Sequence, residues 1–254
     1  MNSHFWGAGQ QTCRMQHKIS PIESELQENP GDLEKVFLIL AEKAQFCSES
    51  DKSTMNQASE HSRQVALFAS GTGSNAVKII EHLRAKYSVS FTIYVNQWKE
   101  GKPRPGILEK AKALGLPARV FTRKELKAPE GVLKQLQAEN TDLIVLAGFL
   151  WLMPSHIVQA YEGGIVNIHP SLLPRYGGKG MFGSREHQAV KEQGDAKTGI
   201  TIHYVNEHYD EGAVILQAAA GVSPSDGVGD IAQKVQALEH RYFPLIVEDL
   251  LLER

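Results

Sequence analysis

The chain has 254 residues, of which 42% are hydrophobic and 22% are charged, and its formal net charge is −2. This composition supports a packed core and excludes wholesale disorder. A nearly neutral chain offers no global field that attracts nucleic acid or an anionic membrane, so neither partner is expected. No apolar run approaches the roughly 18 residues that a membrane-spanning helix needs.

The amino-terminal segment differs in character from the rest of the chain. Residues 1–16 lack the basic start and continuous apolar stretch of a secretory signal. The two cysteines, Cys13 and Cys47, have no metal-ligand spacing, which indicates free thiols in a reducing cytoplasm and predicts no metal site. We therefore expect a cytoplasmic location.

A change of composition near residue 61 divides the chain into an extension, residues 1–60, and a domain, residues 61–254. The extension is expected to be poorly structured or short-helical: the apolar stretch 33–41 predicts a short helix, and the polar residues 48–63 predict a linker. Met55 lies just before the domain, and a chain that starts there is expected to keep full activity. The role of residues 1–60 stays open.

From residue 64 onward, predicted strands alternate with predicted helices. Apolar runs predict strands at 65–69, 91–95, 120–121, 142–147 and 164–170. Helices are expected at 76–83, 107–114 and 132–138, after Pro154, and over 228–252 with a bend at Pro244. Two alternating strands, 199–205 and 213–217, flank an acidic turn and predict antiparallel pairing. The fold class is therefore α/β: a Rossmann-like open, mostly parallel sheet flanked by helices, with an antiparallel edge.

A glycine turn, Gly71-Thr-Gly73-Ser74-Asn75, joins the first predicted strand of the domain to a helix. The free N–H groups and positive dipole end of such a helix favour a phosphate. A plain strand-to-helix turn, with Ser74 or Asn75 as the cap, is the simpler alternative. A dinucleotide site is disfavoured because the second strand ends without an acidic residue, so a mononucleotide or phosphosugar is favoured over NAD.

The segment 167–174, NIHPSLLP, places Asn167 and His169 on the same face of a strand at its carboxyl end. An amide donor beside an imidazole suits acyl transfer, because the amide binds an oxyanion while the imidazole exchanges protons. A core histidine is the alternative. A carboxylate partner for His169 is expected in the acidic turn, where Glu207, Asp210 and Glu211 are the candidates.

Taken together, these motifs resemble the folate-dependent phosphoribosylglycinamide formyltransferases, within the wider formyltransferase fold, over about residues 64–251. The matching segments are 70–75 SGTGSN, 146–149 LAGF, 167–174 NIHPSLLP, 210–217 DEGAVILQ and 236–240 QALEH. The resemblance implies a one-carbon transferase of purine biosynthesis that passes the formyl group of 10-formyltetrahydrofolate to glycinamide ribonucleotide through a tetrahedral intermediate. It leaves open whether the protein is a monomer or a homodimer.

The resemblance also implies roles for individual residues. Asn167, His169 and Asp210 would be catalytic. The substrate would be bound by Gly73, Ser74, Asn75, Gln236, Ala237, Leu238 and Glu239. The folate would be bound by Asn167, by Arg123 or Lys124, by Leu150, Trp151, Leu152 and Met153, and by Asn206, Glu207, His208 and Tyr209. Trp151 departs from relatives that often have arginine there, and the glycine-rich segment 177–186 is expected to be a mobile flap.

Three alternatives share part of this pattern. A formyltetrahydrofolate hydrolase would use water as the acceptor and would need no phosphate loop. A methionyl-tRNA formyltransferase would carry a basic carboxyl-terminal domain, which this sequence does not show. A non-catalytic phosphosugar-binding or NAD-binding module would leave Asn167, His169 and Asp210 without a purpose.

Overall fold

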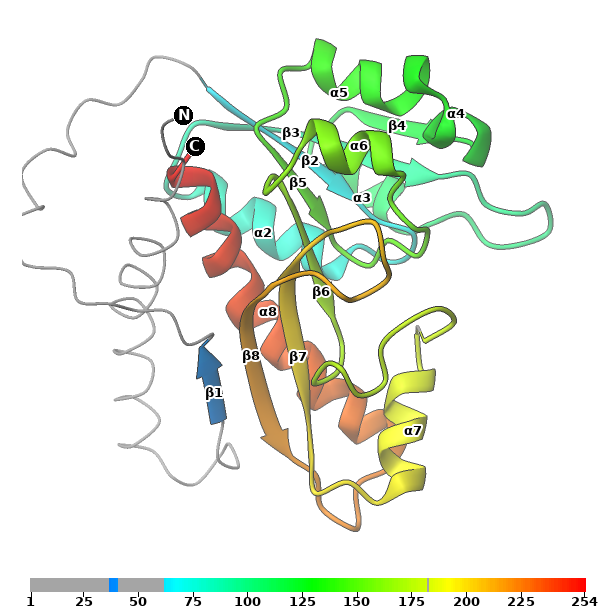
Figure 1. Cartoon of the computed structure of the whole chain (residues 1–254), viewed down its shortest axis with the longest axis vertical. Helices are drawn as coiled ribbons and strands as arrows, with labels where there is room; N and C mark the ends of the chain where they lie inside the picture. The colour runs from blue at the N-terminus through cyan, green and yellow to red at the C-terminus, as the bar shows by residue number, and fades with distance from the viewer. Residues whose placement is uncertain (1–36, 41–61, 182) are drawn as a thin grey trace, which may run out of the picture.

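The computed structural model describes residues 37–40, 62–181 and 183–254, and these residues build one sheet with helices on both faces (Figure 1). The eight described strands lie in the order β1-β8-β7-β6-β5-β2-β3-β4. Their bounds are β1 Phe37–Leu40, β2 Arg63–Phe68, β3 Val89–Asn96, β4 Ala118–Phe121, β5 Leu143–Leu146, β6 Ile165–His169, β7 Lys197–Tyr204 and β8 Val214–Gly221. The helices are α2 Ser74–Arg84, α3 Ile107–Ala113, α4 Arg123–Lys127, η2 Pro129–Leu133, α5 Lys134–Ala138, α6 Ser155–Ala160, α7 Arg185–Gln193 and α8 Val228–Leu252.

The five strands from β6 to β4 are parallel to one another, whereas β7 runs antiparallel to both β6 and β8. The predicted fold class is therefore confirmed. The chain builds outward from β2 through β3 to β4, and then returns to add β5 and β6 on the other side of β2. Ligands of open α/β sheets bind at the carboxyl ends of the strands where the order reverses in this way, here between β2 and β5.

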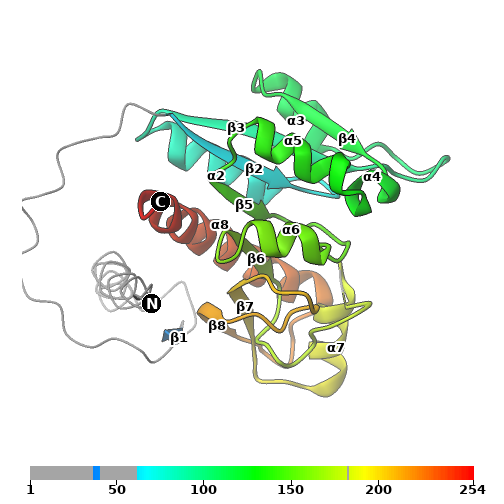
Figure 2. The same cartoon turned by 45° about the horizontal axis from the view of Figure 1, so that its top comes forward.

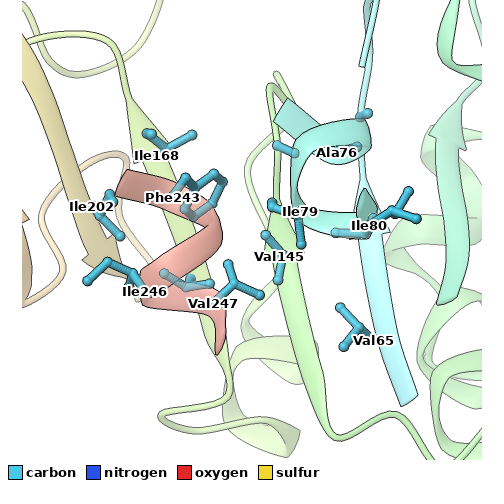
Figure 3. Close-up of a cluster of buried hydrophobic side chains, with 14 of the residues drawn as sticks. Val65, Ala76, Ile79, Ile80, Val145, Ile168, Ile202, Phe243, Ile246 and Val247 are labelled. Carbon is cyan, nitrogen blue, oxygen red and sulfur yellow. The ribbon is translucent and has the colours of Figure 1, made fainter. Parts of the chain in front are cut away.

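Alternate side chains of the central strands enter two separate hydrophobic cores. Val65 and Leu67 of β2 belong to a core that α2, α3 and α8 cover, whereas Ala66 and Phe68 belong to a core that α4, α5 and α6 cover. Figure 3 shows the first core, with side chains of α2 and α8 against those of the sheet. The two layers hold the carboxyl ends of the strands in fixed positions.

The carboxyl-terminal helix α8 lies beside α2 and crosses the sheet (Figure 2). It is amphipathic, and its apolar face, including Val235, Phe243 and Val247, is buried. Pro244 lies inside this helix, as the sequence predicts. Among the helices that the structure describes, none is long and apolar enough to cross a bilayer.

Two sequence predictions differ from the structure. The short helix predicted over 33–41 is wrong for Phe37–Leu40, which form strand β1 antiparallel to β8. The backbone of these four apolar residues pairs with the edge of β8, which would otherwise have unpaired N–H and C=O groups. Hydrophobic periodicity cannot distinguish such a short apolar run from a helix. The predicted linker 48–63 lies almost entirely outside the described residues. The predicted flap 177–186 ends early, because Arg185 and Glu186 already belong to helix α7.

Candidate active site

Strand β6 and the β7–β8 turn bring the three predicted catalytic residues together. Asn167 and His169 alternate with buried apolar residues of β6 and lie at its carboxyl end. Asp210 lies in the turn after β7, and its Oδ2 is 3.6 Å from Nδ1 of His169. The predicted neighbourhood of amide, imidazole and carboxylate therefore exists in the fold.

Oxygen atoms face both ring nitrogens of His169, which is 4% exposed. Nε2 donates a hydrogen bond of 2.8 Å to the carbonyl oxygen of Tyr176, and Nδ1 faces Asp210. The carboxylate of Asp210 is itself fixed by the N–H of Gly178, which donates to Oδ2 at 2.8 Å. These contacts hold the His169 ring in one orientation.

His203 is a member of the site that sequence reasoning missed. It lies on β7 opposite Asn167, and its Nε2 is 3.1 Å from Nδ2 of Asn167 and 3.8 Å from Oδ1 of Asp210. Burial lowers the pKa of His203, which favours the neutral ring. Because its Nδ1 donates to the carbonyl of Tyr204 at 2.8 Å, Nε2 accepts a hydrogen bond from the Asn167 amide. His203 thereby orients that amide.

The glycine turn has the geometry of an anion site. Gly73 precedes α2 with φ of 71°, and a side chain there would overlap Ile107. No side chain caps α2, so the N–H groups of its first turn stay available to a ligand. The Asn75 side chain instead hydrogen-bonds Glu239 of α8, and this bond links the glycine turn to the cavity wall described next.

Two adjacent cavities meet at the catalytic residues. The larger, of about 350 Å³, is lined by His169, Glu186 and Glu239 together with the glycine-rich segment 178–181. The smaller, of about 50 Å³, is lined by Trp151, Leu152, Met153, His203, His208 and Tyr209. Both cavities border Phe149, Asn167, Tyr209 and Asp210. Asn167 and Asp210 therefore stand where a molecule in one cavity would meet a molecule in the other.

Most of the predicted folate residues surround the smaller cavity. Leu150 and Leu152 are 47% and 39% exposed, which is unusual for such large apolar side chains. Tyr209 Oη accepts a hydrogen bond of 3.1 Å from the N–H of Leu152, which joins the β5 loop to the acidic turn. The Arg123 guanidinium lies 4.7 Å from the ring centre of Trp151. Of the two basic candidates, Arg123 is thus the one in contact with a lining residue.

Apart from Glu239, the remaining predicted residues do not line either cavity. Glu207 accepts a hydrogen bond from Gln159, and Asn206 accepts one from the N–H of His208. Within the predicted segment 236–239 only Glu239 reaches a cavity, because Gln236 and Ala237 are exposed and Leu238 packs in the core. Gly73, Ser74 and Asn75 lie outside the cavity lining, but Asn75 contacts it through Glu239. Lys124 is exposed on α4.

Glu186 is a second missed residue. It lies in the first turn of α7, is fully buried and lines the larger cavity. Burial raises the pKa of Glu186, and so does the charge of Asp210, while its own backbone N–H and His169 oppose the shift. The polar sequence around it carries no signal of burial. The helix itself has a signal, because Ser184 and Gly194 bracket it as start and stop residues.

The formyl transferase family model matches residues 63–247 of this chain. The chain belongs to the formyl transferase family. The matched range includes the strand β6 motif, the acidic turn and the glycine turn, so all the site residues described above lie inside it. The family prediction made from the sequence is confirmed.

Several relatives of the chain are named phosphoribosylglycinamide formyltransferase. The chain is 36% identical to phosphoribosylglycinamide formyltransferase of Bacillus subtilis over 74% of this chain and 95% of that protein. It is 35% identical to the chloroplastic phosphoribosylglycinamide formyltransferase of Arabidopsis thaliana over 76% of this chain and 66% of that protein. The crystal structure of phosphoribosylglycinamide formyltransferase from Bacillus halodurans superposes with a TM-score of 0.64 at 34% identity, over 74% of this chain and 95% of that chain.

Proposed function

We propose that this protein transfers the formyl group of 10-formyltetrahydrofolate to the primary amine of glycinamide ribonucleotide, in the purine biosynthetic route. The observation that carries the proposal is the meeting of two cavities at Asn167 and Asp210. A direct transfer needs two substrates whose reacting atoms meet at one point, with an oxyanion donor at that point. The names of the relatives support a formyl transfer to the glycinamide ribonucleotide.

The larger cavity suits the phosphosugar. Its wall includes Glu239, which contacts the glycine turn through Asn75, so a bound phosphosugar would reach from Glu239 toward the α2 N-terminus. The phosphate would bind the free N–H groups after Gly73, and Glu239 would accept hydrogen bonds from the ribose or glycinamide. Segment 178–181 would cover the ligand.

The smaller cavity suits the folate. Its wall combines apolar groups, Leu152 and Met153, with the aromatic ring of Trp151, and Arg123 lies over that ring. A flat heteroaromatic ring would be bound by these apolar surfaces, while Arg123 would attract the anionic tail of a folate. The pocket holds only part of such a ligand, because its open side faces solvent.

The reaction follows from these positions. The amine nitrogen attacks the formyl carbon, a new C–N bond forms, and the carbonyl oxygen becomes an oxyanion. The free N–H of Asn167 and the imidazole ring of His169 stabilise that oxyanion, and Asp210 holds the ring. The C=O bond then re-forms and the C–N10 bond breaks with its electron pair on N10. N10 takes a proton from His169, and the attacking nitrogen loses one proton, which returns to His169.

An absorbance assay that follows loss of the formyl group from the folate tests this proposal. We expect turnover when glycinamide ribonucleotide is present and none when it is omitted. Turnover without the ribonucleotide would instead indicate a hydrolase that uses water. In thermal unfolding, the ribonucleotide and a folate analogue should each raise the melting temperature, and NAD should not. Stabilisation by NAD alone would overturn the proposal.

The proposal includes a cytoplasmic location, which rests on the two isolated cysteines of the sequence. Cell fractionation tests it. Recovery of the protein in an organelle would contradict it, and one relative is named chloroplastic.

A further inference from the structure

Glu186 presents a buried carboxylate that the reaction just described does not use. Its side chain has no exposed surface, and apart from its own backbone N–H no residue that the structure describes donates a hydrogen bond to either carboxylate oxygen. Removing a carboxylate from water without a partner costs several kcal/mol, so proteins rarely keep one in that condition. The position of Glu186 in the wall of the larger cavity points to a ligand group as the missing partner.

Three carboxylates line this cavity, and the other two already have partners. Asp210 accepts the Gly178 N–H and faces His169 and His203. Glu239 hydrogen-bonds Asn75. Glu186 is therefore the lining carboxylate that is free to bind a group that enters the cavity. It lies within electrostatic range of two acids, Asp210 and Glu239, and of two bases, His169 and Arg185.

The chemistry of the acceptor substrate supplies a matching group. An α-amino group has a pKa of about 8, so most of the substrate amine is an ammonium ion at neutral pH. An ammonium nitrogen has no lone pair and cannot attack a carbonyl carbon. Some group must bind this cation and remove one proton before the new C–N bond can form.

We propose that Glu186 binds the ammonium group of the phosphosugar substrate and accepts its proton, which makes Glu186 a catalytic base and a determinant of amine specificity. The inference rests on the proposed function. In this step one N–H bond of the ammonium breaks, its electron pair stays on nitrogen as the attacking lone pair, and the proton moves to a Glu186 oxygen. The neutral acid then returns the proton to water after product release. Asn167 and His169 retain their roles at the oxyanion.

Two variants of Glu186 separate this role from a structural one. Glu186→Gln keeps the shape and removes the charge, and Glu186→Met fills the same space with an apolar side chain. Glu192→Gln, on the exposed side of the same helix, is the matched control. Both Glu186 variants should lower kcat/KM for glycinamide ribonucleotide by about 100-fold or more. KM for the folate should not change, and the control should behave as the wild-type protein.

Binding affinities for two ligands distinguish a role in amine binding from a purely structural role, because a structural role would affect both ligands equally. We would compare glycinamide ribonucleotide with its acetamide analogue, in which a methyl group replaces the aminomethyl group. Loss of a charged hydrogen bond should weaken binding of the amine to Glu186→Gln roughly 10- to 150-fold, while the analogue binds both proteins equally. The melting temperature of both variants should rise by about 2–4 °C, since an unpaired buried charge is removed.

Each result bears on one of the two claims. Wild-type kcat/KM in both variants would overturn the role of Glu186, and so would an equal loss of affinity for amine and analogue. A fall in melting temperature in both variants would show that the carboxylate is structural. If the wild-type protein neither binds nor formylates glycinamide ribonucleotide, then the proposed function fails instead.

Discussion

The amide of Asn167 allows a quantitative test of oxyanion stabilisation. One of its two N–H bonds points to Nε2 of His203 at 3.1 Å, which leaves the other for the junction of the two cavities. Asn167→Ala removes that donor without adding a charge. Loss of one preorganised donor typically costs about 2.7–4 kcal/mol, so kcat should fall roughly 100- to 1000-fold.

The Michaelis constants show whether Asn167→Ala weakens substrate binding or only the stabilisation of the transition state. The proposed phosphate site around Gly73 is separate from Asn167, so KM for the ribonucleotide should stay near its wild-type value. A steady-state absorbance assay over both substrate concentrations measures kcat and both constants. A loss that appears only in kcat identifies an interaction made in the transition state.

His203 provides the control for orientation. In His203→Ala the amide of Asn167 remains but loses its neutral acceptor, so kcat should fall only about fivefold, as for one ordinary hydrogen bond. The double variant should be no slower than Asn167→Ala, because the two residues act as one unit. Near-normal kcat in Asn167→Ala, or a change in KM alone, would refute the assignment of Asn167 as the oxyanion donor.

Four further predictions follow from particular contacts. Gly73→Ala should lose about 1–3 kcal/mol in urea unfolding because of its positive φ, whereas Gly71→Ala, with open space around it, should lose little. Arg123→Ala should raise KM for the folate about threefold to tenfold while Lys124→Ala leaves it unchanged; equal effects would contradict the placement of the folate. Because the pKa of Glu186 is raised in the folded protein, the folded state binds the carboxyl proton more tightly than the unfolded state does. The stability of the wild-type protein relative to Glu186→Gln should therefore be greatest below about pH 4 and should decline as pH rises through the folded pKa. Denaturant unfolding at several pH values measures this difference. A chain that starts at Met55 should keep full activity, since β1 pairs with β8 at the sheet edge away from the cavities; a large loss of kcat would contradict it.

Much of the fold follows from local sequence patterns. The apolar run 142–147 lacks alternation because β5 is buried on both faces, and the alternating run 199–205 corresponds to β7, which pairs antiparallel with β6 and β8. Local patterns were weakest for short elements. The four apolar residues of β1 form a strand only because the edge of β8 is available, and that edge is not visible in the residues themselves.

The site was predictable where its residues share one element. Asn167 and His169 alternate on a single strand, so their common face follows from the period of a strand. His203 joins them only through the register that pairs it with Asn167, and sequence spacing does not determine that register. The place of Glu186 in the site could be predicted only from the way in which α7 packs against the larger cavity. Its burial depends on the tertiary structure, and a polar helix surface would have been the ordinary expectation.

Features that are unfavourable for folding stability concentrate around the two cavities. Of the three described non-glycine residues with positive φ, Tyr176 and Asp210 both contact His169. Gly73 adds a left-handed turn at the phosphate end, and Glu186 adds a buried carboxylate without a partner. Such costs persist when the surrounding structure imposes them and when function requires them. Substitutions that relieve them should therefore stabilise the fold and slow the reaction. Glu186→Gln should combine both effects in one variant, because the proposed partner of its carboxylate is the ammonium group of the substrate.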